Sequence, residues 1–452
     1  MGEPDRRSAP PVALCGATVV VALAPPEVVR ADLTIADGRV RALGPVSEGA
    51  VRRNCAGSLI VPGNVCAHHH LYSALSRGMP YALAPPADFA EILQRVWWRL
   101  DRCLDEESVR ASALRGGLDA LLAGTTTIVD HHASPNFIDG SLDVIAEALG
   151  DLGVRSVLCY EVTDRDGPER AVAGLAENKR FLGRSQDLAR GMVGAHASFT
   201  LSDETLAGCS ELAAGAGVGV HIHVAEDEVD ERDSLARYSR RVVDRLDERG
   251  VLSGRAVLAH CVHVDEAEAR RIEAAGATVV CNPRSNMNNA VGHSPFNRRA
   301  GQVALGTDGI GGDMWAESQA GFFRAKEADL ATPPEWPLSH LAQGARLAGR
   351  VFGERLLGTL RAGAPADLCV LSYDPPTPLR ADNLAGHWVF GLTSAMVRDV
   401  YVAGELVVAA GRSTRVAEAD VAAHEVPVTE RLWRRLEATP QHTYDPRSRS
   451  ER

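Results

Sequence analysis

Two histidines that stand two positions apart, His68 and His70, are the strongest chemical signal in this sequence. They follow a short apolar run that begins with the turn residues Pro62 and Gly63. Side chains alternate between the two faces of a β-strand, so His68 and His70 point one way and His69 points the other. Two imidazoles that project together from a strand end can bind a transition-metal ion such as zinc, iron, nickel or copper. The stretch therefore predicts part of a metal site whose other ligands lie further along the chain.

A site of this kind needs a scaffold, and the strand–helix alternation over residues 62–359 provides one. Helical patterns at Ala87–Cys103 and Glu107–Ala123 alternate with compact apolar strands. This alternation predicts an α/β fold with a (β/α)8 TIM-like barrel. The strands that we expect in it are Thr126–Val129, Ser156–Tyr160, Val193–Ala195, Gly219–Val224, Ala256–Ala259, Thr278–Cys281 and Val303–Leu305.

The two ends of the chain differ from its centre. Residues 1–61 contain short strand patterns with a hairpin signal at Asp37-Gly38, and residues 360–415 return to strands separated by turns. We expect these two regions to pair into one small composite β-sandwich domain beside the barrel. In residues 416–452, the pattern over Ala417–Leu436 predicts a C-terminal helix. We expect a loose tail from Pro440 onwards.

Composition narrows the classes of function. The 452 residues carry a formal net charge of −11, which argues against a nucleic-acid-binding surface. No apolar run is long enough to cross a bilayer, so we expect no membrane partner. An apolar run after Arg6-Arg7 resembles an export signal, but its continuation in alternating apolar and polar residues favours strands. The nine cysteines include no Cys-x-x-Cys pair, which favours reduced thiols in a cytoplasmic protein.

Residues that could bind a metal or move a proton stand where the expected strands end. Catalytic groups of β/α barrels lie at the C-terminal ends of the strands. The residues at these positions are Asp130, His131 and His132, then His196, then His223 with Glu226, then His260, and finally Asp308 in Thr307-Asp308-Gly309. Taken singly, His223 and His260 could be buried structural imidazoles and Asp308 a turn residue. Their arrangement in series favours the functional interpretation.

The sequence resembles the amidohydrolase superfamily over essentially its whole length. The matching motifs are His-x-His at His68 and His70, His-x-x-Glu at His223 and Glu226, the lone His260, and Thr-Asp-Gly at Asp308. Together they look like the mononuclear branch of metal-dependent aminohydrolases, which includes cytosine, guanine and adenosine-type deaminases and triazine hydrolases. The opening stretch His68–Tyr72 with Leu75–Gly78 is similar to that of 8-oxoguanine deaminases and SsnA-type aminohydrolases.

The resemblance implies one divalent metal ion, with zinc preferred and iron as the alternative. The ligands that it implies are His68, His70, His223 and Asp308. Binuclear relatives bridge two metals with a carboxylated lysine at a strand end, whereas the only lysines here, Lys179 and Lys326, lie in helical patterns. We therefore expect a single metal.

The resemblance also implies the catalytic roles. A bound metal lowers the pKa of water and so supplies a nucleophile at neutral pH. Glu226 would take the proton of this water and deliver it to a ring nitrogen, and His260 would orient the water and stabilise the tetrahedral centre. Asp308 would act both as a ligand and as a second proton acceptor.

Substrate contacts are expected at His196, Arg77, Trp315 and His132. His196 stands where related deaminases place a ring-contacting histidine. Arg77 could pair with an anionic or carbonyl group of the substrate or, equally, form a structural salt bridge. Trp315 is expected at the pocket mouth. Trp97 and Trp98 are expected in the core, although a role in a lid remains open.

We therefore expect a homo-oligomeric hydrolase that attacks an amidine-like C–N bond of an aminated nitrogen heterocycle and releases ammonia. The heterocycle would be purine-, pteridine- or triazine-like. The alternative is ring opening of a cyclic amide or amidine, or displacement of chloride. Glu226 favours amine loss, because a chloride leaving group needs no proton. A catalytically inactive ligand-binding barrel is disfavoured because no expected ligand or base is missing.

Overall fold

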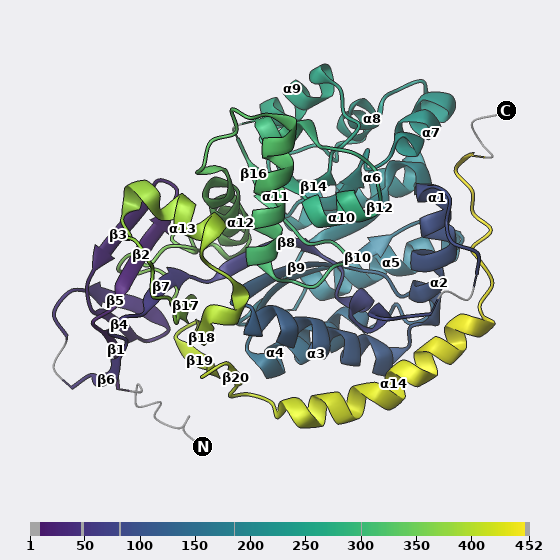
Figure 1. The fold of residues 1–452 in the computed structure, drawn as a ribbon. Coiled ribbons are helices and arrows are strands. Elements are labelled where there is room, and N and C mark those ends of the chain that lie inside the picture. The colour runs from purple at the N-terminus through teal and green to yellow at the C-terminus, as the bar shows by residue number, and fades with distance from the viewer. Residues whose placement is uncertain (1–9, 47–48, 81–82, 185, 300, 448–452) are drawn as a thin grey trace.

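The computed structural model describes residues 10–46, 49–80, 83–184, 186–299 and 301–447. A parallel barrel occupies most of the molecule, and two smaller sheets lie at one end of it (Figure 1). Within these ranges, none of the helices combines the length and apolarity needed to span a bilayer. The predicted fold class, a TIM-like barrel with a separate β region from both chain ends, is confirmed.

Eight parallel strands form the barrel wall, and they pair in the order in which they occur along the chain. They are β8 (Asn64–His69), β9 (Thr125–His132), β10 (Arg155–Val162), β12 (Val193–Ala197), β13 (Val220–Val224), β14 (Val257–His260), β15 (Thr278–Cys281) and β16 (Val303–Leu305), with the short β11 (Ala189–Gly191) paired beside β10. All residues of the eight wall strands are buried, as expected for a parallel sheet covered on both faces. β9 extends three residues beyond its predicted end and therefore includes Asp130, His131 and His132.

The barrel closes where the chain after β16 meets β8. The amide of Thr307 donates to the carbonyl of His68 at 2.9 Å, and the amide of His70 donates to the carbonyl of Asp308 at 3.1 Å. Gly306 lies at this contact, and a Cβ there would stand 2.7 Å from the His68 carbonyl oxygen. Only glycine allows so close an approach of the two chains.

Helices follow most of the strands and cover the outside of the barrel (Figure 1). They are α3 (Glu106–Leu122), α4 (Ser141–Leu152), α5 (Pro168–Leu182), α6 (Asp203–Ala216), α7 (Glu228–Tyr238), α8 (Val242–Glu248), α9 (Glu266–Ala275), α10 (Pro283–Asn288), α11 (Met314–Ala328) and α12 (Trp336–Phe352), with short turns η1 (Leu71–Ser76), η4 (Ser198–Thr200) and η5 (Pro295–Arg298) between elements. In β13, Val220, Ile222 and Val224 belong to the core that the helices share, which leaves the alternate residues for the barrel interior.

The helix predicted over Ala87–Cys103 is interrupted. It consists of α1 (Phe89–Ile92), a π-helical turn η2 (Leu93–Trp97), α2 (Trp98–Leu100) and a 3-10 turn η3 (Asp101–Cys103). Turns of the π type are rare and are frequently found at functional sites. Apolar periodicity along the sequence does not reveal such an interruption.

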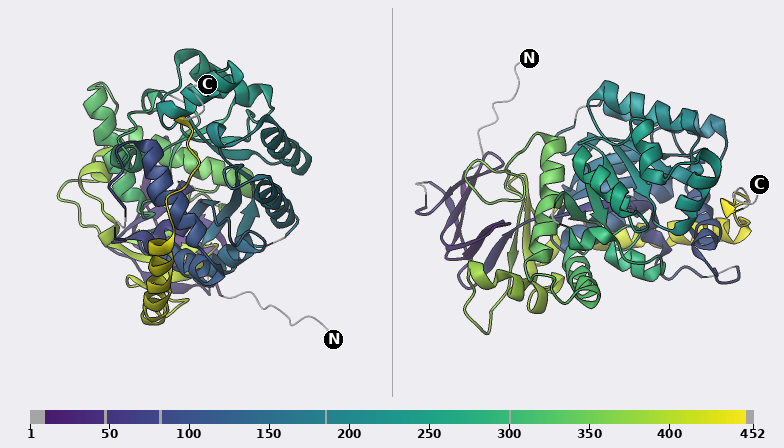
Figure 2. Two further views of the ribbon diagram at one scale, coloured as in Figure 1. Left: turned by 90° about the vertical axis from the view of Figure 1, so that its right-hand side faces the viewer. Right: turned by 90° about the horizontal axis from the view of Figure 1, so that it is seen from above.

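Two sheets beside the barrel share one apolar core, and both chain ends contribute to them (Figure 2). β7 (Leu59–Pro62) pairs antiparallel with β17 (Leu368–Leu371), which joins the two ends. The other strands are β1 (Val12–Cys15), β4 (Leu33–Ala36), β5 (Arg39–Leu43) and β6 (Val51–Asn54) in one sheet, and β2 (Thr18–Leu23), β3 (Pro26–Arg30), β18 (Val397–Val402), β19 (Glu405–Ala409) and β20 (Arg412–Ser413) in the sheet of β7 and β17. β6 was not predicted, because Val51–Asn54 shows no alternation of apolar and polar residues, and all four residues are exposed.

The C-terminal region begins with the expected helix and does not end in a free tail. α14 (Glu418–Ala438) packs against α3, while η6 (Ala381–Asn383), α13 (Leu384–Phe390) and η7 (Ser394–Met396) precede it. The expected loose tail is wrong for residues 440–447, which hydrogen-bond to the segment 94–102. Residues 448–452 lie outside the described residues.

A buried ion pair ties the barrel to the β region and makes a testable stability prediction. The Arg155 guanidinium donates to Asp367 at 2.9 and 3.2 Å, and both residues are buried. Substituting Asp367→Ala leaves Arg155 buried without its partner. The free energy of unfolding, measured by urea denaturation, should fall by about 3–5 kcal/mol.

The matched control is Asp151→Ala, because Asp151 pairs with Arg110 at 2.6 Å with side chains 51% and 39% exposed. Loss of such a surface pair should change the free energy of unfolding by less than about 1 kcal/mol. Equal losses in the two variants would contradict a structural role for the buried pair.

Candidate active site

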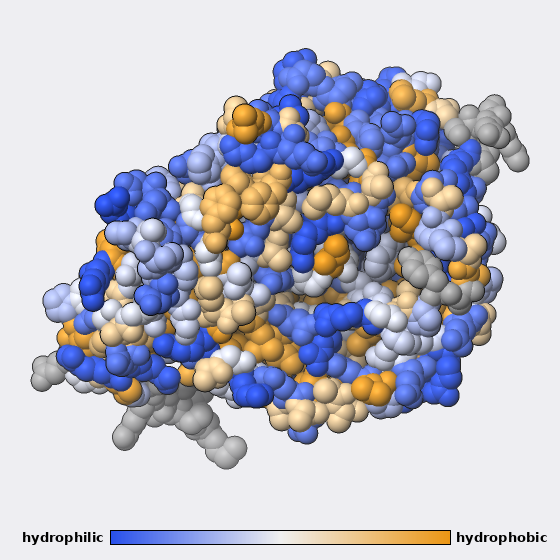
Figure 3. All heavy atoms as spheres, in the orientation of Figure 1, coloured by the Kyte–Doolittle hydropathy of each residue, from blue (hydrophilic) through white to orange (hydrophobic). Residues whose placement is uncertain are grey.

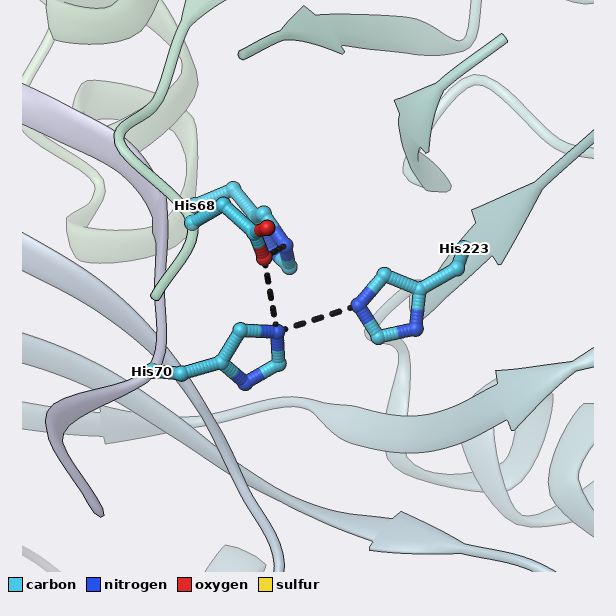
Figure 4. A group of neighbouring side chains, drawn as sticks. His68, His70 and His223 are labelled. Atoms are coloured by element: carbon cyan, nitrogen blue, oxygen red, sulfur yellow. Dashed lines mark hydrogen bonds and ion pairs between the residues drawn. The ribbon is translucent and has the colours of Figure 1, made fainter. Parts of the chain in front are cut away.

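The four residues predicted as metal ligands meet at the C-terminal end of the barrel. The Nε2 atom of His70 lies 3.1 Å from Nε2 of His223 and 3.0 Å from Oδ1 of Asp308. The Nε2 atom of His68 lies 3.2 Å from the same carboxylate oxygen. Figure 4 shows the imidazoles of His68 and His70, from the end of β8, converging with that of His223 from β13. The structure thus brings together all four candidate ligands, from β8, from β13 and from the loop after β16.

Each imidazole is oriented through its other ring nitrogen. Nδ1 of His70 donates to the carbonyl of His131 at 2.6 Å, and Nδ1 of His223 donates to the carbonyl of His196 at 2.8 Å. Nδ1 of His68 is 2.9 Å from Nε2 of His221, which lies in the barrel interior as expected. These contacts direct all three Nε2 atoms to one point, as the partners of metal-binding histidines do.

The spacing and chemistry of the four atoms fit one metal ion. Zinc lies about 2.0–2.2 Å from imidazole nitrogen and carboxylate oxygen, so neighbouring ligands of one ion are about 3–3.5 Å apart. The neighbouring atoms here are 3.0–3.2 Å apart. Three nitrogens and one oxygen form a donor set that zinc and iron both accept.

The protonation preferences of the candidate ligands also suit a cation. Burial lowers the pKa of His68 and of His223 well below the usual value, so both imidazoles are neutral. Burial would raise the pKa of Asp308, but hydrogen bonds with His68 and His70 hold it well below its usual range. Burial also lowers the pKa of His70, yet the hydrogen bond and charge of Asp308 outweigh it and raise that pKa to about 9. A cation that binds here must therefore displace a proton from His70.

Glu226 and His260 stand beside this group. Nε2 of His260 is 3.5 Å from Oε2 of Glu226, while its Nδ1 is 2.8 Å from the side-chain oxygen of Asn286. Burial raises the pKa of the Glu226 carboxyl to about 7. A carboxyl with a pKa near neutrality can accept a proton and release it again. Ligand atoms of Glu226, His260 and Asp308 all lie within 4.8 Å of one another.

The backbone is strained where these side chains leave their strands. His260, Cys261 and Asp308 have φ angles of 71°, 49° and 52°, and Ala225 beside Glu226 has 43°. Residues other than glycine rarely adopt this left-handed region, and such residues cluster at functional sites.

A cavity lies over the group, with an empty volume of ≈ 630 Å³ that includes open solvent. An apolar wall is formed by Phe89, Leu93, Trp97, Trp98 and Phe199. The polar wall consists of Tyr72, Glu161, His196, Glu226, Asp230 and Asn289 together with the candidate ligands His70, His223 and Asp308. No lysine or arginine stands among the described residues of this lining.

Of the four expected substrate contacts, the structure places only His196 in the cavity lining. Arg77 is 70% exposed and pairs with Asp119 at 2.8 Å, which is the structural alternative weighed for it. His132 was expected where its strand ends, before a long loop. Because β9 continues to His132, strand alternation directs its ring away from the barrel interior, against Tyr72 and Tyr160. Arg77 and His132 therefore do not line the cavity, contrary to expectation.

Trp315 is also wrongly placed by the sequence. Its ring is buried, donates to the Ala123 carbonyl at 2.8 Å and stacks on Trp388 at a centroid distance of 4.4 Å. Trp97 and Trp98 line the cavity, and Trp98 is at the same time buried in a hydrophobic cluster, as expected. The packing of α11 on α13 (Leu384–Phe390), which the sequence does not reveal, draws Trp315 away from the mouth.

Sequence reasoning missed several residues that support the site. Ser285 donates to Asp308 Oδ2 at 2.5 Å, and the amide of Asn289 is 3.4 Å from Glu226 Oε1. The polar run Asn282–Asn286 at the end of β15 signalled this region, whereas nothing marked Asn289. Glu161 lines the cavity and is held by Arg165 at 2.8 Å and by His131 at 3.2 Å.

Comparisons with known proteins agree with this geometry. The model of the Amidohydrolase family matches residues 59–407. A 5'-deoxyadenosine deaminase of Methanopyrus kandleri is 30% identical over 385 residues, which cover 83% of this chain and 86% of that protein. A 5-methylthioadenosine/S-adenosylhomocysteine deaminase of Desulforudis audaxviator is 30% identical over 424 residues, which cover 90% of this chain and 94% of that protein.

Solved structures share the fold. An adenosine deaminase from Xanthomonas campestris with bound zinc superimposes with a TM-score of 0.78 and 22% identity, covering 94% of this chain and 99% of that one. An atrazine chlorohydrolase from Arthrobacter aurescens TC1 complexed with zinc gives a TM-score of 0.80 and 21% identity, covering 92% and 100%.

Metal binding can be tested by removing one candidate ligand. Purified protein should hold one metal ion per chain, and His223→Ala should retain less than about a tenth of it after dialysis against a chelator. Metal content is measured by inductively coupled plasma mass spectrometry. His424→Ala is the control, because His424 is exposed on α14 and should leave the metal content unchanged. Full retention of metal in the His223 variant would exclude this residue as a ligand.

Proposed function

The chain belongs to the amidohydrolase family, and we propose that it removes the exocyclic amine of an adenine-type ring by hydrolysis and releases ammonia. Its class of reaction is metal-dependent hydrolysis of a carbon–nitrogen bond other than a peptide bond, as in the deaminases to which it is similar. The observation that carries the proposal is the placement of Glu226 and His260 beside four converging ligand atoms.

We propose roles for these residues as follows. His68, His70, His223 and Asp308 would hold the metal, which when bound lowers the pKa of water and polarises the attacked carbon. Glu226 accepts a proton from the attacking water and delivers it to the ring nitrogen next to that carbon. His260, fixed by Asn286 through Nδ1, directs Nε2 at the oxygen that develops negative charge. Asp308 takes the second proton and passes it to the leaving amine.

The lining of the cavity supports a neutral nucleoside as substrate. Its aromatic side chains offer faces on which a purine ring can stack. Its carboxylates, among them Glu161 at the end of β10, can accept hydrogen bonds from sugar hydroxyls. The described lining holds no lysine or arginine to pair with a phosphate. We therefore propose an adenosine derivative without an anionic group at its 5' position, such as 5'-deoxyadenosine or 5'-methylthioadenosine.

We further propose zinc as the metal, the cytoplasm as the location and a homo-oligomer as the assembly. Zinc is bound in the adenosine deaminase and the chlorohydrolase that share the fold. All nine cysteines are free, and eight of them are buried, which suits a reducing compartment. The oligomer is proposed from the resemblance alone.

Ammonia release tests the proposed reaction. The zinc-loaded protein should release ammonia from adenosine derivatives in a panel that also contains guanine, pterin, pyrimidine, amino-triazine and chloro-triazine compounds. Glu226→Gln should lower kcat by about 10²–10⁴-fold, because the glutamine cannot carry the proton. The variant should keep its metal. Ring opening or chloride release without ammonia would replace deamination by the alternative hydrolytic reaction.

The charge of the preferred substrate can be tested with one matched pair. Adenosine and adenosine 5'-monophosphate present the same ring, but the phosphate would lie among carboxylates. The kcat/KM of the monophosphate should be lower by about tenfold or more at low salt, since like charges at close range cost several kcal/mol before screening. Equal values for the two compounds would contradict the inference from the lining.

A further inference from the structure

The helical segment 89–103 forms one wall of the cavity and is poorly stabilised by itself. Phe89, Leu93 and Trp97 follow one another at four-residue spacing and line the cavity, as does Trp98. The segment is short, and the π-helical turn at Leu93–Trp97 interrupts it. Short helices in water depend on tertiary packing for their stability. The position of this wall is therefore set by what packs against its other face.

The C-terminal segment, residues 439–447, packs along that other face. Three arginines of the wall donate to its backbone and the end of α14: Arg99 to the carbonyls of Thr439 at 2.8 Å and Leu436 at 2.6 Å, Arg102 to Pro440 at 2.8 Å, and Arg95 to the Gln441 side chain at 3.4 Å. The left view of Figure 2 shows this segment, in yellow, crossing over the helical segment.

The contacts continue to the start of the wall. Gln94 forms a two-way contact: its carbonyl accepts from the amide of His442 at 2.9 Å, and its side chain donates to the carbonyl of Tyr444 at 2.8 Å. Arg447 donates to Asp88 at 2.7 Å, and Asp88 caps the N-terminus of α1. The C-terminal segment thus runs antiparallel to the wall over its whole length.

Trp98 connects this segment to the cavity. Its ring contacts His442 and Tyr444, with centroids 5.3 and 5.8 Å away, and also contacts His196 and Phe199 of the cavity at 6.0 and 6.4 Å. The Tyr444 hydroxyl donates to the carbonyl of Phe199. A shift of the C-terminal segment would therefore move an aromatic face of the cavity.

A chain of buried polar contacts makes a second connection. Nε2 of His442 is 3.2 Å from Asp166, which is 3.4 Å from the Arg165 guanidinium. Arg165 in turn donates to the cavity carboxylate of Glu161 at 2.8 Å and to Asp101 of the wall at 2.5 Å. All of these side chains are nearly inaccessible to solvent.

We propose that residues 440–447 are a positioning element of the active site, which holds the aromatic wall and Glu161 against the substrate. His442 and Tyr444 are its positioning residues, and they act through Trp98 and Arg165. Their contacts with Trp98, Asp166 and Phe199 connect them to the substrate cavity, so they govern substrate binding and leave the metal centre intact. This inference rests on the proposed function only in taking the cavity as the substrate pocket.

The test is a chain that stops after Thr439, compared with the full chain. The truncated chain should keep its metal and a kcat within about threefold, while KM rises about tenfold or more, because a misplaced wall weakens binding of the ring. Hydrogen exchange should become faster in residues 89–103 and stay unchanged in β10 and β12. Adding a peptide of residues 440–452 should restore KM, and a scrambled peptide should not.

Point variants keep the test decisive if the truncated chain loses metal or unfolds. His442→Ala should raise KM and accelerate exchange in residues 89–103, whereas His442→Gln keeps a donor for Asp166 and should restore both. His424→Ala, on the exposed side of α14, should change neither. Unchanged KM and unchanged exchange after truncation, or equal effects of the alanine and glutamine variants, would overturn the proposal.

The exchange measurement also separates this inference from the proposed function. If no adenine compound is deaminated, the proposed function fails, and the exchange rates in residues 89–103 still decide whether the C-terminal segment holds the wall. Faster exchange would then support the positioning element without a known substrate, and unchanged exchange would reject it.

Discussion

The hydrogen bonds that join the first barrel strand to the chain after the last one are the constraint on which the site depends. The amides of Thr307 and Asp308 both donate to the carbonyl of His68, and the amide of His70 donates back to Asp308. Residues 240 positions apart in the chain thereby share a metal-binding geometry. The ligand group is complete only when the barrel is closed, and a bound cation would in turn stabilise the closed barrel, because it binds the folded chain alone.

Burial gives the ligand group its chemistry. Imidazoles removed from water are neutral unless a carboxylate faces them, and a carboxylate ringed by imidazoles stays ionised. His223 follows the first rule, whereas at His68 burial outweighs the facing Asp308 and still lowers the pKa. At His70 the hydrogen bond and charge of Asp308 outweigh burial, and Asp308 itself follows the second rule. At Glu226, burial outweighs the effect of the neighbouring His260 and raises the pKa of the carboxyl to about 7. Similar groups a few ångströms apart thus acquire different roles from their surroundings.

The pocket is assembled from parts of the chain that a barrel by itself does not need. The wall at residues 89–103 is an insertion between the first strand and its covering helix, and the C-terminal segment beyond α14 supports it. Loops and insertions of this kind choose the substrate, while the strands hold the catalytic groups. A related barrel could therefore keep the same metal centre and accept a different ring.

The sequence by itself determined the barrel, the composite β region and the residues that converge on the metal position. Strand alternation fixes which side chains point inward, and His68, His70, His223, His260 and Asp308 lie at or just beyond the C-terminal ends of their strands. Glu226 was identified by its motif. These assignments depend on the spacing of residues along the chain, which the sequence shows directly.

Only the tertiary structure decided which side chains line the cavity. Three more strand residues in β9 directed His132 away from the barrel interior, and the packing of α11 on α13 drew Trp315 away from the mouth. The π-helical turn brought Trp97 and Trp98 into the lining, and residues 440–447, expected to be loose, turned out to hold them. Each of these outcomes depends on contacts between segments far apart in the chain. The local periodicity of apolar residues does not predict such contacts.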